Sequence, residues 1–167
     1  MSIKFEDLGL HPTLIKAIKD QNYIRPTEIQ EQAIPILIKK NDILGSAQTG
    51  TGKTAAFALP ILHHLINEKK YNHKTKIRAL VITPTRELAI QIANNFTSYS
   101  KYNKIRNTVI FGGVKQGSQT KTLQSGVDVL IATPGRLLDL MNQGFVSLKE
   151  IRYFVLDEAD RMLDMGF

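Results

Sequence analysis

The sequence contains no cysteine, which excludes a disulfide framework and any zinc or iron–sulfur site held by cysteine ligands. It also has no apolar run near the ~20 residues that a membrane-spanning helix needs. The first residues, MSIKFEDLGL, lack the basic-then-apolar order of a secretory signal peptide. The four histidines show no metal-ligand spacing. We therefore expect a cytoplasmic protein in a reducing compartment, with no membrane partner.

Length and composition predict one ordinary globular domain. The 167 residues are 43% hydrophobic, which is enough sequence to bury roughly 70% of the unfolded surface. Lys and Arg number 22 against 15 Asp and Glu, and the resulting charge of +7 attracts polyanions such as nucleic acid. The densest basic run, residues 68–78, is read most simply as a solvated surface loop. Charge alone therefore assigns no nucleic-acid site.

Five short runs of aliphatic and β-branched residues alternate with helical stretches along the chain. Each run is apolar almost throughout, which is typical of strands covered on both faces, and the segments between them are long enough for crossover helices. The fold class that this pattern predicts is α/β, with a doubly wound, mostly parallel sheet and helices on both faces. The expected strands are residues 42–47, 78–84, 107–113, 128–134 and 153–160.

Two helices are expected ahead of the first of these strands. One runs from Pro12 to about Asp20, and the second begins at Pro26, which stands at a first-turn position with Glu28 close behind. Pro35 and Pro60 are expected to kink or interrupt their helices, because proline lacks the amide hydrogen that a helix interior needs.

The segment AQTGTGKT, residues 47–54, follows the first expected strand and opens a helix. Gly50 and Gly52 let the backbone turn its N–H groups toward phosphate oxygens at a helix N-terminus. Lys53 would pair with the β and γ phosphates, and the Thr54 hydroxyl would bind Mg²⁺. The generic phosphate-loop pattern has Gly where this chain has Ala47. The flanking strand and helix favour a polyphosphate site over an accidental turn.

The segment DEAD, residues 157–160, follows the apolar run YFVL. Asp157 stands at the tip of an expected buried strand, where a carboxylate needs compensation and is well placed to hold Mg²⁺ through water. Glu158 could orient or deprotonate the water that attacks the γ-phosphate. The alternative is that these acids begin a solvated helix, and it has most weight for Asp160 and Asp164.

Together these segments resemble the DEAD-box RNA helicases, and the match spans nearly the whole chain. AQTGTGKT and DEAD resemble motifs I and II, PTRELAIQ (84–91) resembles motif Ia, Gly112–Gly113 the GG motif, and TPGR (133–136) motif Ib. NYIRPTEIQ (22–30) resembles the Q motif, with Asn22 where the family usually has Gly. The resemblance implies a RecA-like P-loop NTPase fold, with ATP and Mg²⁺ as cofactors and RNA as partner.

For the nucleotide, the resemblance implies adenine specificity. The Gln30 amide, with a donor and an acceptor, would read the adenine edge while Phe5 packs beside the base. The alternative is a polar helix position for Gln30 and a core position for Phe5. Lys53, Asp157 and Glu158 are the implied catalytic residues, and Thr54 and Asp157 the Mg²⁺ ligands. The implied nucleotide contacts are Phe5, Arg25, Gln30, Gln48, Thr49, Gly50, Thr51, Gly52, Lys53 and Thr54.

For RNA, the resemblance implies contacts on the loops after the second, third and fourth expected strands. Arginines can pair with phosphates, threonine hydroxyls can donate, and glycines let the two backbones approach. Such contacts favour RNA over DNA with little base preference and strong salt dependence. Arg86 and Arg136 have an alternative role as helix caps or in structural ion pairs. The implied residues are Pro84, Thr85, Arg86, Gly112, Gly113, Thr133, Pro134, Gly135 and Arg136.

The resemblance also implies a second RecA-like domain with arginine fingers, and a Ser-Ala-Thr motif that Asp160 would contact. Neither has a match here, so residues 1–167 are expected to be a C-terminally incomplete N-terminal RecA-like ATP-binding domain. Such a chain would bind nucleotide with little turnover and no unwinding. An open sheet edge or uncovered apolar face would favour self-association. Two other functions stay open: a noncatalytic nucleotide-binding or RNA-binding module, and a small-molecule kinase or GTPase.

Overall fold

The computed structural model describes residues 2–43, 52–68 and 76–166. The chain divides into two compact units, with the boundaries Met1–Lys69 plus Asn95–Lys104 for the first and Lys70–Asn94 plus Ile105–Phe167 for the second. One of these boundaries falls within helix α4 (Arg86–Tyr99). The predicted contacts Gln48, Thr49, Gly50 and Thr51 lie outside the described residues, as does Ala47.

The first unit is helical. It contains the short helix η1 (Phe5–Leu8) and the helices α1 (Pro12–Asp20), α2 (Glu28–Ile38) and α3 (Lys53–Asn67). Helix α1 has the predicted bounds, because His11 caps its first turn and the backbone N–H of Gln21 closes its last. Leu14, Ala17 and Ile18 form the buried stripe of this helix.

Helix α2 begins two residues later than the sequence predicted. Thr27 is its N-cap: the Thr27 hydroxyl accepts the N–H of Gln30, and the Gln30 side chain accepts the N–H of Thr27. Pro26 therefore precedes the cap instead of occupying the first turn. Neither α2 nor α3 ends at its internal proline, Pro35 or Pro60. Pro60 is buried, so packing offsets the roughly 3 kcal/mol that an interior proline costs.

The second unit contains a parallel sheet of four strands, β1 (Ala79–Ile82), β2 (Asn107–Ile110), β3 (Val129–Ala132) and β4 (Tyr153–Leu156). The order across the sheet is β2-β3-β1-β4, and Ala79 lies between Val129 and Tyr153. Four of the five predicted strands are confirmed, and so is the α/β fold class with its parallel sheet. Most of the remaining one, the first expected strand at residues 42–47, lies outside the described part of the chain.

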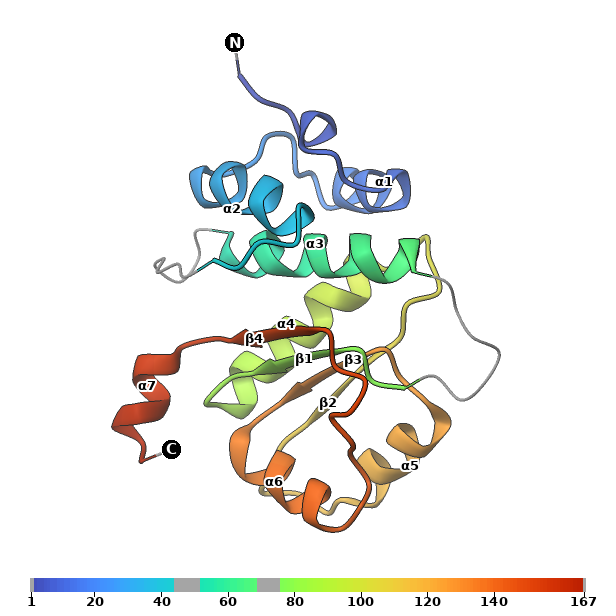
Figure 1. The fold of residues 1–167 in the computed structure, drawn as a ribbon, viewed down its shortest axis with the longest axis vertical. Helices are drawn as coiled ribbons and strands as arrows, with labels where there is room; N and C mark the ends of the chain where they lie inside the picture. The colour runs from blue at the N-terminus through green and yellow to red at the C-terminus, as the bar shows by residue number, and fades with distance from the viewer. Residues whose placement is uncertain (1, 44–51, 69–75, 167) are drawn as a thin grey trace. The chain divides into compact units, whose positions relative to one another are not determined.

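Helices alternate with these strands (Figure 1). Helix α4 follows β1, α5 (Gly117–Ser125) follows β2, α6 (Pro134–Asn142) follows β3, and α7 (Ala159–Asp164) follows β4. One face of the sheet packs against α6 through the buried cluster Leu80, Ile110, Leu130, Ala132, Leu137, Leu140 and Val146. Because every strand runs in the same direction, all four carboxyl ends meet at one edge of the sheet.

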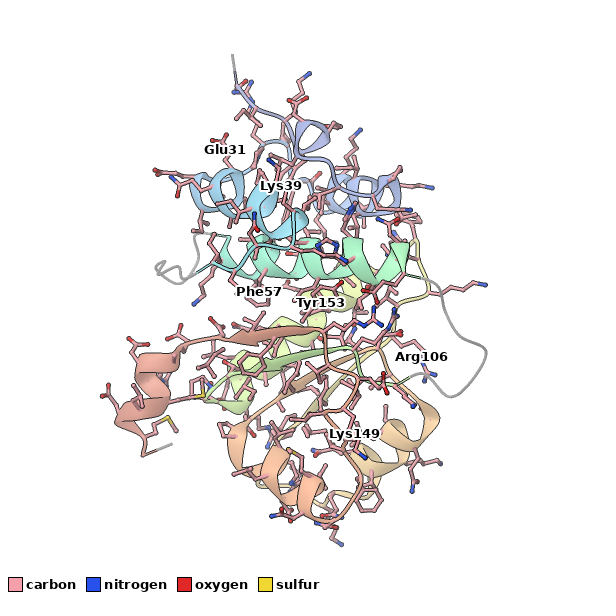
Figure 2. All side chains as sticks on the ribbon, viewed as in Figure 1. Glu31, Lys39, Phe57, Arg106, Lys149 and Tyr153 are labelled. Carbon is pink, nitrogen blue, oxygen red and sulfur yellow. The ribbon has the colours of Figure 1, made fainter. Side chains whose placement is uncertain are left out.

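At the opposite edge, Asp128 ties the amino ends of three strands together. Its buried carboxylate accepts hydrogen bonds from Arg78 Nη2 at 2.7 Å and from the backbone N–H of Arg106 at 2.9 Å. Arg106, labelled in Figure 2, immediately precedes β2. The carbonyl of Arg78 in turn accepts the N–H of Arg152 and Tyr153 at the start of β4. These hydrogen bonds fix the register of the sheet at the amino ends of the strands, opposite the edge that carries the predicted motifs.

Strand β4 lies at the edge of the described sheet, and its apolar side chains are partly uncovered. Phe154 is 57% exposed and Leu156 50% exposed, and Leu163 and Met165 in and after α7 are also exposed. These exposed side chains fit the expected uncovered apolar face, whereas the open sheet edge and self-association stay predictions. None of the described helices is both long and apolar enough to cross a membrane.

Candidate nucleotide and RNA sites

The described end of the phosphate-loop motif lies at the start of α3 in the first unit. Gly52 is the N-cap, in the left-handed conformation at φ 84°, and Lys53 and Thr54 are the first two helical residues. All three are half-buried. The N–H groups of this first turn have no earlier helical carbonyl to bind, so they form the positive end of a 15-residue helix. This arrangement suits an anionic ligand beside Lys53.

Gln30 lies against this turn. Its side-chain Nε2 donates a hydrogen bond to the Gly52 carbonyl at 3.1 Å, while its Oε1 accepts the N–H of Thr27 at 3.0 Å. The side chain is buried, so its amide links the cap of α2 to the cap of α3. A Cβ at residue 52 would lie 2.3 Å from Gln30 Nε2, so only glycine fits this contact.

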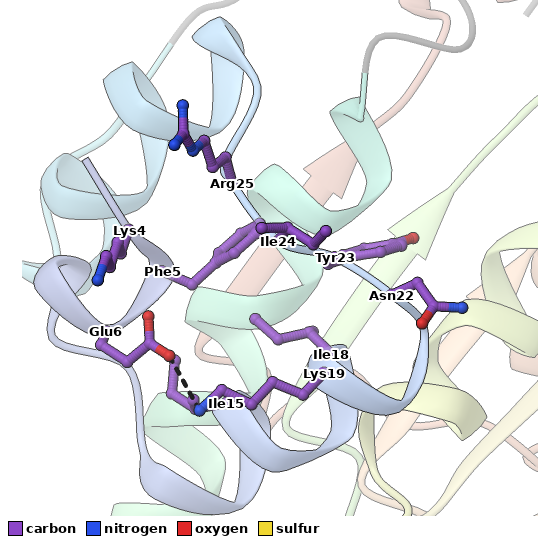
Figure 3. A pocket seen from close by; sticks show the side chains of 10 residues that line it. All are labelled: Lys4, Phe5, Glu6, Ile15, Ile18, Lys19, Asn22, Tyr23, Ile24 and Arg25. Atoms are coloured by element: carbon purple, nitrogen blue, oxygen red, sulfur yellow. Dashed lines mark ion pairs between the residues drawn. The ribbon is translucent and has the colours of Figure 1, made fainter. Parts of the chain in front are cut away.

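A pocket of about 380 Å³ opens in the first unit beside η1 and α1, and it contains both Phe5 and Arg25. The Phe5 ring stacks on Tyr23, with the ring centres 6.2 Å apart, and Ile24 is 80% exposed nearby (Figure 3). Gln30 does not line this pocket. The structure therefore brings Phe5 and Arg25 together, and places the Gln30 amide against Gly52.

The loop that carries the Q-motif resemblance begins with a strained residue. Asn22 adopts φ 60°, a left-handed conformation that costs most residues free energy but that glycine and asparagine tolerate best. This explains why Asn can stand at a position where the family usually has Gly. The departure from the family pattern therefore preserves the backbone conformation.

The two predicted catalytic acids follow β4 directly. Asp157 is buried, and its N–H donates to the Ile82 carbonyl, which continues the pairing of β4 with β1 by one residue. Glu158 occupies the N-cap position of α7, without a capping hydrogen bond from its side chain, and has φ 57°, an uncommon conformation for a residue of this size. Strained residues of this kind gather at functional sites, which makes Glu158 a candidate on its geometry as well as its sequence.

The segment after β1 holds the predicted residues Pro84, Thr85 and Arg86. Thr85 caps α4: its Oγ1 accepts the Leu88 N–H at 3.3 Å, which leaves the hydroxyl hydrogen for donation. Arg86 is exposed, and its guanidinium lies 4.7 Å from the centre of the Phe111 ring, on the segment after β2. The cap is thus Thr85, and Arg86 has a stacking partner rather than a capping role.

Gly112 and Gly113 follow β2 and are exposed. A Cβ built at either residue would find no atom within 4 Å, and Gly113 has φ 81°. The packing inside this chain therefore leaves open space above both residues, as a close approach by another backbone requires.

Thr133, Pro134, Gly135 and Arg136 form the start of α6 after β3. The Arg136 side chain is only 11% exposed: Nη1 donates to Gln119 Oε1 at 2.9 Å and Nη2 donates to the Val114 carbonyl at 2.8 Å. Arg136 thus has a structural role in this fold, which was the alternative that the sequence left open.

Two residues in this network, Gln119 and Phe111, were not singled out from the sequence. Gln119 lies on α5 one turn before Leu123, a residue that packs against the core, so a polar side chain on the buried face of a short helix was the available signal. Phe111 ends an apolar run and gave no separate signal.

The carboxyl edge of the sheet therefore collects most of the predicted residues of the second unit. Thr83 to Arg86, Gly112–Gly113, Thr133 to Arg136 and Asp157–Glu158 follow the four strands in turn. In addition, the Thr83 hydroxyl is fully buried and has no hydrogen-bond partner among the described residues. No group of three His, Cys, Asp or Glu in the described ranges is arranged to hold a metal ion.

The model of the DEAD/DEAH box helicase family matches residues 27–167. The chain belongs to this family, as the motifs indicated. It is 44% identical over 164 residues to the ATP-dependent RNA helicase RhlB of Actinobacillus succinogenes, covering 98% of this chain and 40% of that protein.

Relatives from eukaryotes are similar to the same extent. The identity is 43% to the DEAD-box ATP-dependent RNA helicase 20 of Arabidopsis thaliana, over 98% of this chain and 32% of that protein. It is 42% to the ATP-dependent RNA helicase DBP2 of Candida albicans, over 98% of this chain and 29% of that protein. The chain thus spans less than half the length of these three helicases.

Proposed function

We propose that this chain is the ATP-binding part of an RNA-dependent ATPase that locally unwinds RNA duplexes. The proposal is carried by one observation: the carboxyl ends of β1 to β4 are each followed by residues suited to phosphate or RNA chemistry. In a parallel α/β sheet this edge is where ligands bind. The family membership and the names of the three relatives support the same function.

In this proposal the nucleotide is ATP. Lys53 pairs with its phosphates, Gln30 and Phe5 recognise its base, and Glu158 orients the attacking water. The Thr54 hydroxyl and the Asp157 carboxylate are hard oxygen donors of the kind that Mg²⁺ prefers, so they fit the role of Mg²⁺ ligands. A bound Mg²⁺ would neutralise charge on the transferred phosphate.

RNA is the proposed partner, held through its phosphates and 2′-hydroxyls. Arg86 supports this role because it is exposed, and Gly112 and Gly113 support it because open space lies above them. Contacts of this kind give little base preference and a strong dependence on salt. We also propose a cytoplasmic location, which fits a sequence with no cysteine.

For the isolated 167 residues we propose nucleotide binding with little turnover and no unwinding. The relatives named as helicases are more than twice as long as the matched part. A second RecA-like domain that supplies arginine fingers is the proposed partner for hydrolysis, and related fingers accelerate phosphoryl transfer by roughly 10³ to 10⁵.

Calorimetric titration with ADP and with GDP, each with Mg²⁺, tests the nucleotide part. Gln30→Ala would also remove the capping box of α2, so Gln30→Glu is the sharper variant: it keeps the acceptor for the Thr27 N–H and loses the amide donor. Gln32→Glu, an exposed position on the same helix, is the matched control. We expect selective ADP binding in the unsubstituted chain and in Gln32→Glu, and a loss in Gln30→Glu.

Fluorescence anisotropy with a labelled oligouridine and the corresponding DNA tests the RNA part, at low and at physiological salt. We expect RNA to bind more tightly than DNA, and salt to weaken the binding of both.

In the nucleotide titration, a preference for GDP over ADP would favour a GTPase or kinase instead. Binding of neither nucleotide would refute the proposed function for this chain.

A further inference from the structure

Gln119 occupies an unusual position for an uncharged polar side chain. It is buried on α5, and its amide is used at both ends: Nε2 donates to the Phe111 carbonyl at 3.1 Å, and Oε1 accepts from Arg136 Nη1 at 2.9 Å. A side-chain amide offers a donor and an acceptor on one planar group. The orientation of the amide is therefore fixed, because turning it over would place its NH₂ against the guanidinium.

The two partners of Gln119 lie in two different candidate RNA loops. Phe111 begins the loop after β2 that continues into Gly112 and Gly113, and Arg136 opens α6 after β3. Arg136 binds the first loop itself, through the Val114 carbonyl at 2.8 Å. Gln119 and Arg136 thus hold the loop on either side of its two glycines.

The third candidate loop joins the same network. The Arg86 guanidinium, after β1, lies over the ring of Phe111, the residue whose carbonyl Gln119 binds. Phe111 therefore links the loop that carries Arg86 to Gln119. All of these contacts lie within the second unit and within described residues.

We propose that Gln119 is a positioning residue for the RNA site, which sets the relative geometry of the three loops that carry Arg86, Gly112–Gly113 and Arg136. The inference rests on the proposed RNA binding. Gln119 itself does not contact RNA in this proposal. It holds the glycine loop, whose two glycines have no side chains with which to anchor it.

Additional contacts explain why the loop needs anchors from outside. Gly113 has φ 81°, both glycines are exposed, and a Cβ built at either would meet no atom within 4 Å, so neither could be anchored there by a side chain of its own. Beyond the loop, the amides of Gln116 and Gln143 bind each other at 2.8 and 3.0 Å, but Gln116 is only half-buried and Gln143 is exposed. The buried anchor is Gln119, and buried hydrogen bonds lose most when one partner is removed.

The test compares Gln119→Met, which removes both hydrogen bonds at similar size, with Gln119→Glu, which keeps the acceptor for Arg136 and loses the donor to Phe111. Gln124→Met makes the same change at an exposed position on the same helix and serves as the control. Affinity for a labelled oligouridine is measured by anisotropy at a temperature where each variant is folded by circular dichroism. ADP affinity and hydrogen exchange of the amides of residues 112–115 are measured on the same samples.

We expect Gln119→Met to weaken RNA binding roughly two- to tenfold, as the loss of ordered hydrogen bonds predicts, and to accelerate amide exchange in the glycine loop. Gln119→Glu should weaken RNA binding in the same direction, while ADP affinity and the Gln124→Met variant stay unchanged. A role in stability alone would lower the melting temperature but leave the RNA affinity of the folded protein intact.

Several outcomes would overturn the inference. They are unchanged RNA affinity in both Gln119 variants, an equal loss in Gln124→Met, or failure of both Gln119 variants to fold. Absence of RNA binding by the unsubstituted chain would instead refute the proposed function. The amide exchange of the loop does not depend on RNA, so it still reports in that case whether Gln119 anchors the loop.

Discussion

Replacing Gly52 with alanine should destabilise the first unit for two separable reasons. Gly52 has φ 84°, and a left-handed conformation costs a residue with a Cβ roughly 1–2 kcal/mol. The added Cβ would also lie 2.3 Å from Gln30 Nε2 and 2.9 Å from Thr27 Oγ1, distances at which something must move. The variant therefore combines a backbone cost with a steric cost.

The steric part follows from the contacts that would have to break. Moving Gln30 away removes its hydrogen bond to the Gly52 carbonyl, worth about 1 kcal/mol, and disturbs the capping box of α2, worth about 1 kcal/mol more. The expected loss for Gly52→Ala is therefore about 3–4 kcal/mol, a large share of the stability of a small domain.

Gly9→Ala is the matched control for this measurement. Gly9 lies in the same unit and has φ 83°, but no atom lies within 4 Å of its built Cβ. It should cost only the backbone part, about 1–2 kcal/mol. Urea unfolding followed by circular dichroism gives both values, and the difference between them isolates the contact with Gln30. Equal losses in the two variants would refute the steric reasoning.

Three further predictions concern other parts of the molecule. Burial and the neighbouring His64 and His11 lower the pKa of His63 below its ordinary value of 6.5. The unfolded chain therefore binds this proton more readily than the folded chain does. The contribution of His63 to the free energy of unfolding should be fully present above pH 6.5 and be lost as the pH falls below it. Removing the carboxylate in Asp128→Ala should cost roughly 3–5 kcal/mol, since it breaks the largely buried ion pair with Arg78 and removes the acceptor of the Arg106 N–H. Arg86→Ala and Arg136→Ala should weaken RNA binding and leave ADP affinity unchanged.

Each of these predictions has a control. His63→Asn should flatten the dependence of unfolding free energy on pH between 7.5 and 5.5, and an unchanged slope would contradict the role of His63. Asp164→Ala, at an exposed position in the same unit as Asp128, should cost little. Lys121→Ala removes one exposed positive charge from α5. If it lowered RNA affinity as much as Arg86→Ala does, the effect of Arg86→Ala would be explained by net charge alone.

The strands could be predicted because their signal is local. The runs that became β1 to β4 are apolar at almost every position, and each is short enough to be a strand between helices. Helix α1 was equally local, since Pro12 and the apolar spacing fix its start and its face. For the same reason, Asp157 and Glu158 could be placed at a strand end from the sequence.

The errors came from interactions that override local rules. Pro26 suggested the start of α2, but the capping box between Thr27 and Gln30 satisfies more backbone groups and sets the start later. Pro35 and Pro60 suggested a kink or an interruption; the helices are not interrupted, since α2 and α3 continue past both prolines because tertiary packing outweighs propensity. A single sequence gives no measure of that packing.

Gln30 and Gln119 show where sequence reasoning reaches its physical limit. Both are buried glutamines whose amides donate to a loop carbonyl and accept a second hydrogen bond, and each joins a helix to a candidate binding loop. Gln30 was singled out only through the family resemblance, and Gln119 was missed, because the partners of a buried amide lie far along the chain. Gln30 Nε2 has a second N–H and Oε1 a second lone pair, so in the proposed function the amide can pair with the adenine edge and still hold Gly52 and Thr27, which couples base binding to the start of α3 through one side chain.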